Sequence, residues 1–253
     1  MKHTPHSIAG TSRIALLSLI LAFGAFLPAR AQQVPAFSAA HDGVTIDCGT
    51  FGRFTLTYPT LDTGSDKPLV PVEITASDGK AKLKYAGDAE VDVSAEPDGT
   101  VSYAFLNPPA GLKTYRVSML IDAGFSQGGK WQIGSVASTA FPAEKPSKPH
   151  LFQGNASAFT LSNFEGKSLA FGVPAYSYQE ITDNREWGWK IFSWIFVAPF
   201  EALGFSPKAG QEMRFDLAID DGSGAGRTRQ LMWNGGSRNS GDRTDWGAAT
   251  LLK

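Results

Sequence analysis

The sequence predicts an all-β fold, an antiparallel β-sandwich of jelly-roll-like character with few or no long helices. Three observations predict it. Short segments alternate apolar and polar residues, turn signals recur at roughly ten-residue intervals, and no segment has the apolar period of a long helix. The composition agrees, because aromatic residues make up 11% of the chain and its 27 glycines and 15 prolines favour turns. With 42% hydrophobic and 19% charged residues, the chain can build a core and is not a disordered protein.

The first 31 residues have the parts of a secretion signal. Lys2 and Arg13 are basic, residues 14–27 are almost wholly apolar, and Ala29 and Ala31 form a small-x-small cleavage site. The apolar run is too short to cross a ~30 Å hydrocarbon core as a helix, and no longer run follows. We therefore expect a secreted or periplasmic protein with no membrane span once the signal is removed. An uncleaved membrane anchor is the alternative.

Charge, cysteine content and histidine spacing exclude several classes of function. The chain has 23 basic and 24 acidic residues, and loss of the three basic residues of the signal leaves a net charge of −4. Such a chain has no electrostatic basis for binding nucleic acid. A single cysteine, Cys48, excludes an internal disulfide and a cysteine-based zinc site, and we expect it as a buried thiol. His41 and His150 match no histidine metal motif.

Strands are expected throughout residues 32–140, an N-terminal β-meander that is either a sub-domain or the first half of one sandwich. An Asp-Gly pair at 78–79 and a Pro-Asp-Gly triplet at 97–99 are turn signals between alternating segments. The expected strands, with the apolar residues that share one face, are 51–58 (Phe54, Leu56, Tyr58), 70–76 (Val70, Val72, Ile74), 80–86 (Leu83, Tyr85), 90–94 (Val91, Val93), 100–106 (Val101, Tyr103, Phe105) and 113–121 (Tyr115, Val117, Met119, Ile121).

A proline-rich loop at 141–156 is the expected boundary before the second half of the chain, 157–253. Pro142, Pro146 and Pro149 have no backbone N–H to donate, so no sheet ladder is expected to run through this loop.

The second half is expected to continue with strands. They are predicted at 157–162, 168–173, 191–197 and 211–219 (Met213, Phe215, Leu217 and Ile219 inward). The segment 191–197 is apolar on both faces, which is typical of a central strand, and Trp194 is expected in the core. Pro199 and Gly204 bracket a predicted short helical turn.

Several features follow one another in a distinctive order near the C-terminus. They are the turn at 198–204, the segment 207–211 leading into an alternating strand, the paired acids Asp220 and Asp221 among glycines, the segment 231–235 (LMWNG), and the closing segment 245–251 (DWGAATL). In this order, residues 195–252 resemble the C-terminal half of family 9 carbohydrate-binding modules and related sugar-binding sandwiches. The resemblance implies a β-sandwich that binds carbohydrate.

The chain also departs from that family. The family's opening Ile-Asp-Gly segment and its Trp-containing strand pair are absent from residues 32–160. Gly241 follows Asn239 and Ser240 where the family tends to place an aromatic clamp. The resemblance therefore supports the expected fold better than it supports a binding site like that of the family.

The segment 183–190, DNREWGWK, is the densest cluster of side chains suited to sugar binding. Aromatic faces stack on the C–H surfaces of sugars, and planar polar side chains hydrogen-bond to their hydroxyl pairs. In a strand, Trp187 and Trp189 would point to the same side. The alternative is a structural loop in which Trp189 packs into the core and Arg185 pairs with Asp183 or Glu186. The predicted substrate-binding residues are Arg185, Trp187, Trp189, Asn234, Asn239 and Trp246.

The acidic residues allow a catalytic alternative. Asp220 and Asp221 are adjacent, so in a strand they face opposite sides, and a carboxylate pair would need Asp183 or Glu186 as a partner. The candidate catalytic residues are therefore Asp183, Glu186 and Asp221, with Arg185. A calcium site at Asp220 and Asp221 is a further option, although the spacing does not match an EF-hand and a solvated turn is the favoured interpretation of the pair.

We therefore hypothesise a secreted sandwich that recognises a poly- or oligosaccharide through Trp stacking and hydrogen bonds from Arg, Asn and Asp. A polysaccharide-active enzyme, either a glycoside hydrolase or a lyase, is one alternative. An envelope module that binds another protein is the other.

Overall fold

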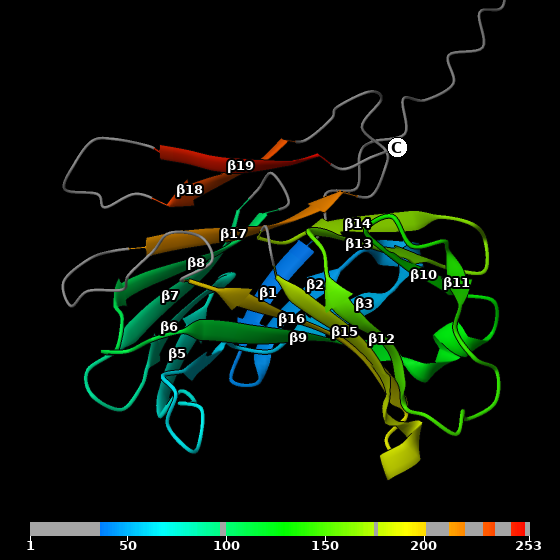
Figure 1. Cartoon of the computed structure of the whole chain (residues 1–253), viewed down its shortest axis with the longest axis horizontal. Helices are drawn as coiled ribbons and strands as arrows, with labels where there is room; N and C mark the ends of the chain where they lie inside the picture. Colours follow the sequence, from blue (N-terminus) through cyan, green and yellow to red (C-terminus); the bar gives the residue numbers. More distant parts are fainter. Residues whose placement is uncertain are drawn as a thin grey trace, which may run out of the picture. The chain divides into compact units, whose positions relative to one another are not determined.

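A computed structural model shows an all-β protein, in which antiparallel strands form two large sheets (Figure 1). The structure describes residues 36–96, 100–174, 177–200, 213–220, 230–235 and 244–250. In the last three ranges, the side chains of Phe215, Leu217 and Ile219 alone are described. All described residues belong to one compact unit, Gln32–Lys253.

The first sheet has eight strands in the order β1-β2-β3-β9-β16-β15-β12, with β4 also paired to β9. Each pair is antiparallel, and β16 lies centrally, as the apolar segment 191–197 predicted. The strands are β1 (Ala36–Ala40), β2 (Gly43–Asp47), β3 (Arg53–Leu56), β4 (Thr60–Asp62), β9 (Thr114–Asp122), β12 (His150–Asn155), β15 (Tyr178–Asp183) and β16 (Ile191–Pro199).

The second sheet has nine strands in the order β11-β10-β13-β14-β17-β8-β7-β6-β5. They are β5 (Glu73–Ser77), β6 (Lys80–Lys84), β7 (Glu90–Glu96), β8 (Thr100–Asn107), β10 (Lys130–Ile133), β11 (Thr139–Ala140), β13 (Ala158–Ser162), β14 (Ser168–Gly172) and β17 (Met213–Asp220). A separate hairpin pairs β18 (Gln230–Gly235) with β19 (Thr244–Thr250).

Helical structure in the described residues is limited to three short 3-10 turns. They are η1 (Gly49–Phe51), η2 (Ala123–Ser126) and η3 (Asn184–Trp187). None of the described residues forms a helix that is long and apolar enough to span a membrane.

The two sheets pack face to face through one aromatic core. Trp194 of β16 is fully buried and stacks on Phe159 of β13, with ring centroids 4.4 Å apart and planes 18° apart. Tyr115 of β9 meets Phe105 of β8 with ring centroids at 5.2 Å and Phe215 of β17 at 5.5 Å. The structure thus confirms a sandwich with a core position for Trp194, and burying such rings supplies much of its stability.

Alternation predicted the long strands correctly. In β9, the four residues expected on one face are all buried, and in β17 the same holds for Phe215, Leu217 and Ile219. Each large sheet pairs strands from before and after the proline-rich stretch, since β9 pairs with β16 and β8 pairs with β17. The residues of both halves therefore share one core.

The predicted strand at 70–76 is wrong in its first half. The strand β5 begins only at Glu73. Val70 and Val72, which precede it, are both more than half exposed. Pro71 has no N–H and stands between the two valines, so a continuous ladder cannot form there.

Three smaller expectations also change. Pro199 does not start a helical turn but ends β16 opposite Thr114, and residues 201–204 of that predicted turn lie outside the described residues. The proline-rich loop gives way to β12 at His150, directly after the last of its prolines. Cys48 is half-buried and packs against the core instead of lying fully within it.

Trp194 is fully buried and Trp189 is exposed, so substitutions at these two positions should differ in their effect on stability. Trp194→Ala removes a fully buried ring and is expected to lower the free energy of unfolding by about 3–5 kcal/mol. Trp189→Ala removes a ring that is 61% exposed and should change the free energy of unfolding by less than about 0.5 kcal/mol. Urea unfolding of both variants checks this, and equal losses would contradict the assignment of Trp194 to the core.

Candidate functional site

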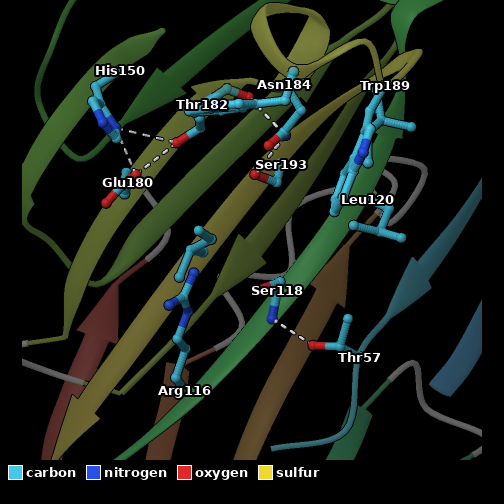
Figure 2. Close-up of a pocket in the computed structure, with 13 residues that line it drawn as sticks. Thr57, Arg116, Ser118, Leu120, His150, Glu180, Thr182, Asn184, Trp189 and Ser193 are labelled. Atoms are coloured by element: carbon cyan, nitrogen blue, oxygen red, sulfur yellow. Dashed lines mark hydrogen bonds and ion pairs between the residues drawn. The ribbon is translucent and has the colours of Figure 1, made fainter. Parts of the chain in front are cut away.

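A groove of about 340 Å³, lined by polar, aliphatic and aromatic side chains, lies on the face of the eight-stranded sheet that points away from the core. Its size falls within the range of small-ligand sites. The central strands of the sheet form its floor, and Trp187 and Trp189 lie among its lining residues. Figure 2 shows His150, Glu180 and Thr182 together on one side of the groove, with Trp189 beside Leu120 on the other.

Strand alternation generates the floor. In β9, Tyr115, Val117, Met119 and Ile121 face the core, so the residues between them face the groove. The same alternation in β16 buries Phe192, Trp194 and Phe196 and turns the residues between them outward. The outward residues that line the groove are Arg116, Ser118 and Leu120 of β9, Ile191, Ser193 and Ile195 of β16, and Glu180 and Thr182 of β15.

The register places outward residues from distant parts of the sequence side by side. Leu120 lies opposite Ser193, Ser193 opposite Thr182, and Thr182 opposite His150. Neighbouring strands are about 4.8 Å apart, so one such row crosses the sheet with a regular spacing. Thr57, directly after β3, extends the lining of the groove. Its hydroxyl accepts a hydrogen bond from the backbone N–H of Ser118 at 3.0 Å.

Glu180 is the centre of a hydrogen-bond network on the floor. Its Oε1 accepts from the Thr182 hydroxyl at 2.6 Å and from His150 Nδ1 at 2.8 Å. Its Oε2 accepts from Gln153 Nε2 and from the Tyr178 hydroxyl, both at 3.5 Å. Because an ionised carboxylate only accepts, Nδ1 of His150 carries a proton and leaves Nε2 for a ligand.

The network also sets the ionisation of Glu180. Partial burial alone would raise its pKa, but hydrogen bonds from Thr182, His150 and Gln153, with the charge of His150, outweigh burial. The pKa of Glu180 therefore lies below its ordinary value of 4.5, and the carboxylate is ionised at neutral pH.

The 3-10 turn η3 and the residues directly after it position the two tryptophans, which do not lie in a strand. Trp187 ends η3, and Gly188 follows in the left-handed region at φ 82°, which glycine adopts without a Cβ clash. Trp187 and Trp189 are 56% and 61% exposed. The alternative in which Trp189 packs into the core is therefore wrong. Asn184 anchors the turn to β16, since its Nδ2 donates to the Ser193 hydroxyl at 3.0 Å.

The same turn is held from below by a buried ion pair. The Asp183 carboxylate is 0% exposed and accepts from Arg185 Nε at 2.9 Å and from Nη2 at 2.7 Å. Arg185 also donates to the carbonyls of Pro142 and Ala143 at 2.8 and 2.9 Å, and its guanidinium lies 4.8 Å from the Phe192 ring centroid. The pair thus fastens the proline-rich segment to η3.

This placement corrects two sequence-based roles. Asp183 was a candidate catalytic acid, but its carboxylate is buried and bonded to Arg185, so a substrate cannot reach it. Arg185 was a candidate sugar ligand, but its guanidinium donors bind Asp183 and backbone carbonyls. Arg185 is instead paired with Asp183, as the structural-loop alternative predicted for these two residues.

The other predicted residues do not join the described groove. Glu186 pairs with Lys145 at 3.2 Å on the surface and does not line the groove. The predicted residues Asp221 and Asn239 lie outside the described residues. Asp220 ends β17, Asn234 lies in β18 and Trp246 in β19, where only the backbone is described, so the calcium option has no described ligand geometry. Among the described residues, no group of three His, Cys, Asp or Glu side chains could hold a metal ion.

No protein-family model and no curated protein matches the chain. The resemblance of residues 195–252 to family 9 carbohydrate-binding modules therefore remains a prediction. Much of that segment lies outside the described residues, whereas the groove is formed almost entirely by residues that precede it.

The buried ion pair predicts a local change in protease sensitivity. Asp183→Asn leaves Arg185 without its counter-charge and should lower the free energy of unfolding by about 3 kcal/mol. It should also release the proline-rich segment, so a Glu-specific protease is expected to cleave after Glu144 at least about tenfold faster than in wild type. Glu186→Gln breaks only an exposed pair and is the control, with an expected loss below about 1 kcal/mol. Equal cleavage rates in Asp183→Asn and wild type would contradict the fastening role.

The Glu180 network predicts a pH-dependent contribution to stability. Because folding lowers the pKa of Glu180, its ionised form stabilises the protein fully above the ordinary value of 4.5 and loses this effect as the pH falls through the lowered pKa. Glu180→Gln should therefore lower the Tm at neutral pH, and the difference from wild type should shrink towards about pH 3. Thermal unfolding of both proteins across this range checks the prediction, which a pH-independent difference would contradict.

Proposed function

We propose that the protein binds carbohydrate chains in the groove on the outer face of its eight-stranded sheet. One observation carries the proposal: two tryptophans with more than half of their surface exposed line a groove whose floor carries polar as well as aliphatic side chains. Large apolar side chains exposed beside polar ones mark binding surfaces. Sugars need this combination, because their rings present C–H faces to stack on and hydroxyls to hydrogen-bond.

The polar side chains of the floor supply the hydrogen bonds that sugar hydroxyls require. Ser118 contributes a hydroxyl group, Thr57 a hydroxyl whose proton is still available, and His150 its Nε2, whereas the Thr182 hydroxyl already donates to Glu180. All of these residues except His150 and Thr57 lie within long central strands, and His150 starts β12. A ligand therefore meets a surface that is already ordered, which reduces the entropy cost of binding.

The groove supports binding better than hydrolysis. Glycoside hydrolysis uses a pair of carboxyl groups across the scissile bond. Among the described lining residues Glu180 is the one carboxylate, and four protein groups already bind it. The hydrolase and lyase alternatives remain predictions that assays for reducing sugars and unsaturated products would test.

A protein partner is the remaining alternative, because exposed tryptophans also anchor protein interfaces. Thr57, Ser118 and Ser193 place hydroxyl groups among the aliphatic side chains of the floor, which favours a polyhydroxylated ligand over a wholly apolar protein surface. With the predicted secretion signal, we place this binding outside the cytoplasm, in the periplasm or the medium.

Binding should depend on the exposed ring of Trp189. We expect isothermal titration against soluble polysaccharides, among them dextran, pectin and cellulose derivatives, to identify a ligand. For that ligand, Trp189→Ala should weaken affinity by about tenfold, the equivalent of about 1.4 kcal/mol of stacking. Trp189→Phe keeps an aromatic face and should lose less.

The control variant is Phe164→Ala. It removes a ring that is even more exposed but does not line the groove, so it should bind like wild type. If no polysaccharide produces heat, or if Trp189→Ala binds as tightly as wild type, the proposal is overturned.

A further inference from the structure

We infer that the groove is selective for acidic polysaccharides and that Arg116 binds the carboxylate of the sugar. The inference rests on the proposed function and adds the class of ligand to it. The inference starts from two charged side chains that line the groove. Glu180 has hydrogen-bond partners within the protein, whereas Arg116 has none among the described residues.

Arg116 faces the groove because it alternates with buried neighbours. Tyr115 and Val117, on either side of it in β9, are both buried in the core, whereas Arg116 is exposed. Figure 2 shows its side chain on the same face of the sheet as Ser118 and Glu180. A ligand that lies across the floor would therefore pass over the guanidinium.

Arg116 differs from the other arginines whose side chains are described. Arg53 pairs with Asp47 at 2.8 Å, and Arg185 pairs with Asp183 at 2.7 Å. Within the described part of the chain, the guanidinium of Arg116 has neither an ion pair nor a hydrogen bond. A planar fork of N–H donors is thus left for a ligand.

The neighbours of Arg116 in the sheet do not neutralise it. It lies opposite Val197 of β16 on one side and Thr60 of β4 on the other. The acid nearest along β4 is Asp62, which lies opposite Thr114, and its Oδ1 accepts from the backbone N–H of Gly64 at 2.7 Å.

Glu180 does not compensate for Arg116 either. Its two carboxylate oxygens are occupied by Thr182, His150, Gln153 and Tyr178. Glu180 therefore keeps its charge, but its oxygens are already occupied and do not pair with Arg116. A ligand carboxylate can form a charge-assisted pair with the guanidinium, whereas a neutral sugar can only accept hydrogen bonds from it.

The guanidinium of Arg116 has the geometry to bind a carboxylate. Its fork matches the two oxygens of a planar carboxylate in parallel hydrogen bonds. A uronic acid carries such a group on each ring together with hydroxyls, so one ligand can contact Arg116, the hydroxyl row and Trp189. The structure thus points to a polyuronate as the ligand.

The test compares ligands that differ only in charge. The protein is titrated with polygalacturonate and with the same polymer after methyl esterification, which removes the charge and keeps the sugar. We expect polygalacturonate to bind at least about tenfold more tightly, as for a charge-assisted hydrogen-bonded pair. Arg116→Gln should lose this preference while its affinity for the methyl ester stays unchanged.

Two further comparisons make the result specific. Lys82→Gln removes an exposed positive charge from β6 of the other sheet and should keep the preference, which controls for net charge. Dextran and dextran sulfate form a second matched pair, and a preference for the sulfate that exceeds the preference for the uronate would overturn the carboxylate assignment.

The outcomes separate the inference from the function. Equal affinity for polygalacturonate and its ester, or a preference that survives in Arg116→Gln, overturns the inference and leaves carbohydrate binding intact. Absence of binding to every charged and neutral polymer overturns the proposed function and the inference with it.

Discussion

The groove depends on one buried polar link between neighbouring strands. The indole Nε1 of Trp194 donates to Gln179 Oε1 at 2.9 Å, and Gln179 Nε2 donates to the carbonyl of Ala156 at 2.8 Å. Both side chains are fully buried, so a register that broke these bonds would leave polar groups unpaired in the core. A slip of one residue in β15 would also turn Glu180 and Thr182 inward. The link therefore fixes which side chains reach the groove.

A second buried interaction explains why the tryptophans are exposed. Asp183 and Arg185 occupy the underside of η3, where the pair reaches the proline-rich segment, and Asn184 holds the turn to Ser193. With the polar residues of the segment committed to these contacts, Trp187 and Trp189 are left on the solvent side. A buried ion pair is costly to desolvate and contributes little net stability, so its role here is to orient the turn. Within the segment 183–190, Asp183, Asn184 and Arg185 thus support the turn, and Trp187 and Trp189 are exposed and line the groove.

Period-two alternation predicted strands such as β9 and β17, because each has one face in the core, whereas β16 was predicted from its apolar run and β15 was not predicted. Alternation failed at Val70 and Val72, where Pro71 interrupts the ladder. The capping pattern failed at Pro199, whose pairing with Thr114 depends on a distant strand. The tryptophans of the groove were predicted from their local density. The floor was not, because Ser118, Glu180 and His150 are unremarkable in sequence and become neighbours only through the strand order. Their polar type at outward positions was visible, but the pairing that assembles them was not.

The origin of the floor also bears on what the site can recognise. Side chains that project from adjacent strands lie in rows with the fixed spacing of the sheet, and a groove of this kind suits an extended ligand with regularly repeated groups. Within such rows, specificity has to come from positions where the protein leaves a group unsatisfied. Glu180 is enclosed by its own neighbours, whereas Arg116 is flanked by Val197 and Thr60. In our proposal the contrast between these two charges, and not the aromatic rings, sets the chemical class of ligand, because stacking accepts any sugar ring whereas a guanidinium without a partner binds a carboxylate most strongly.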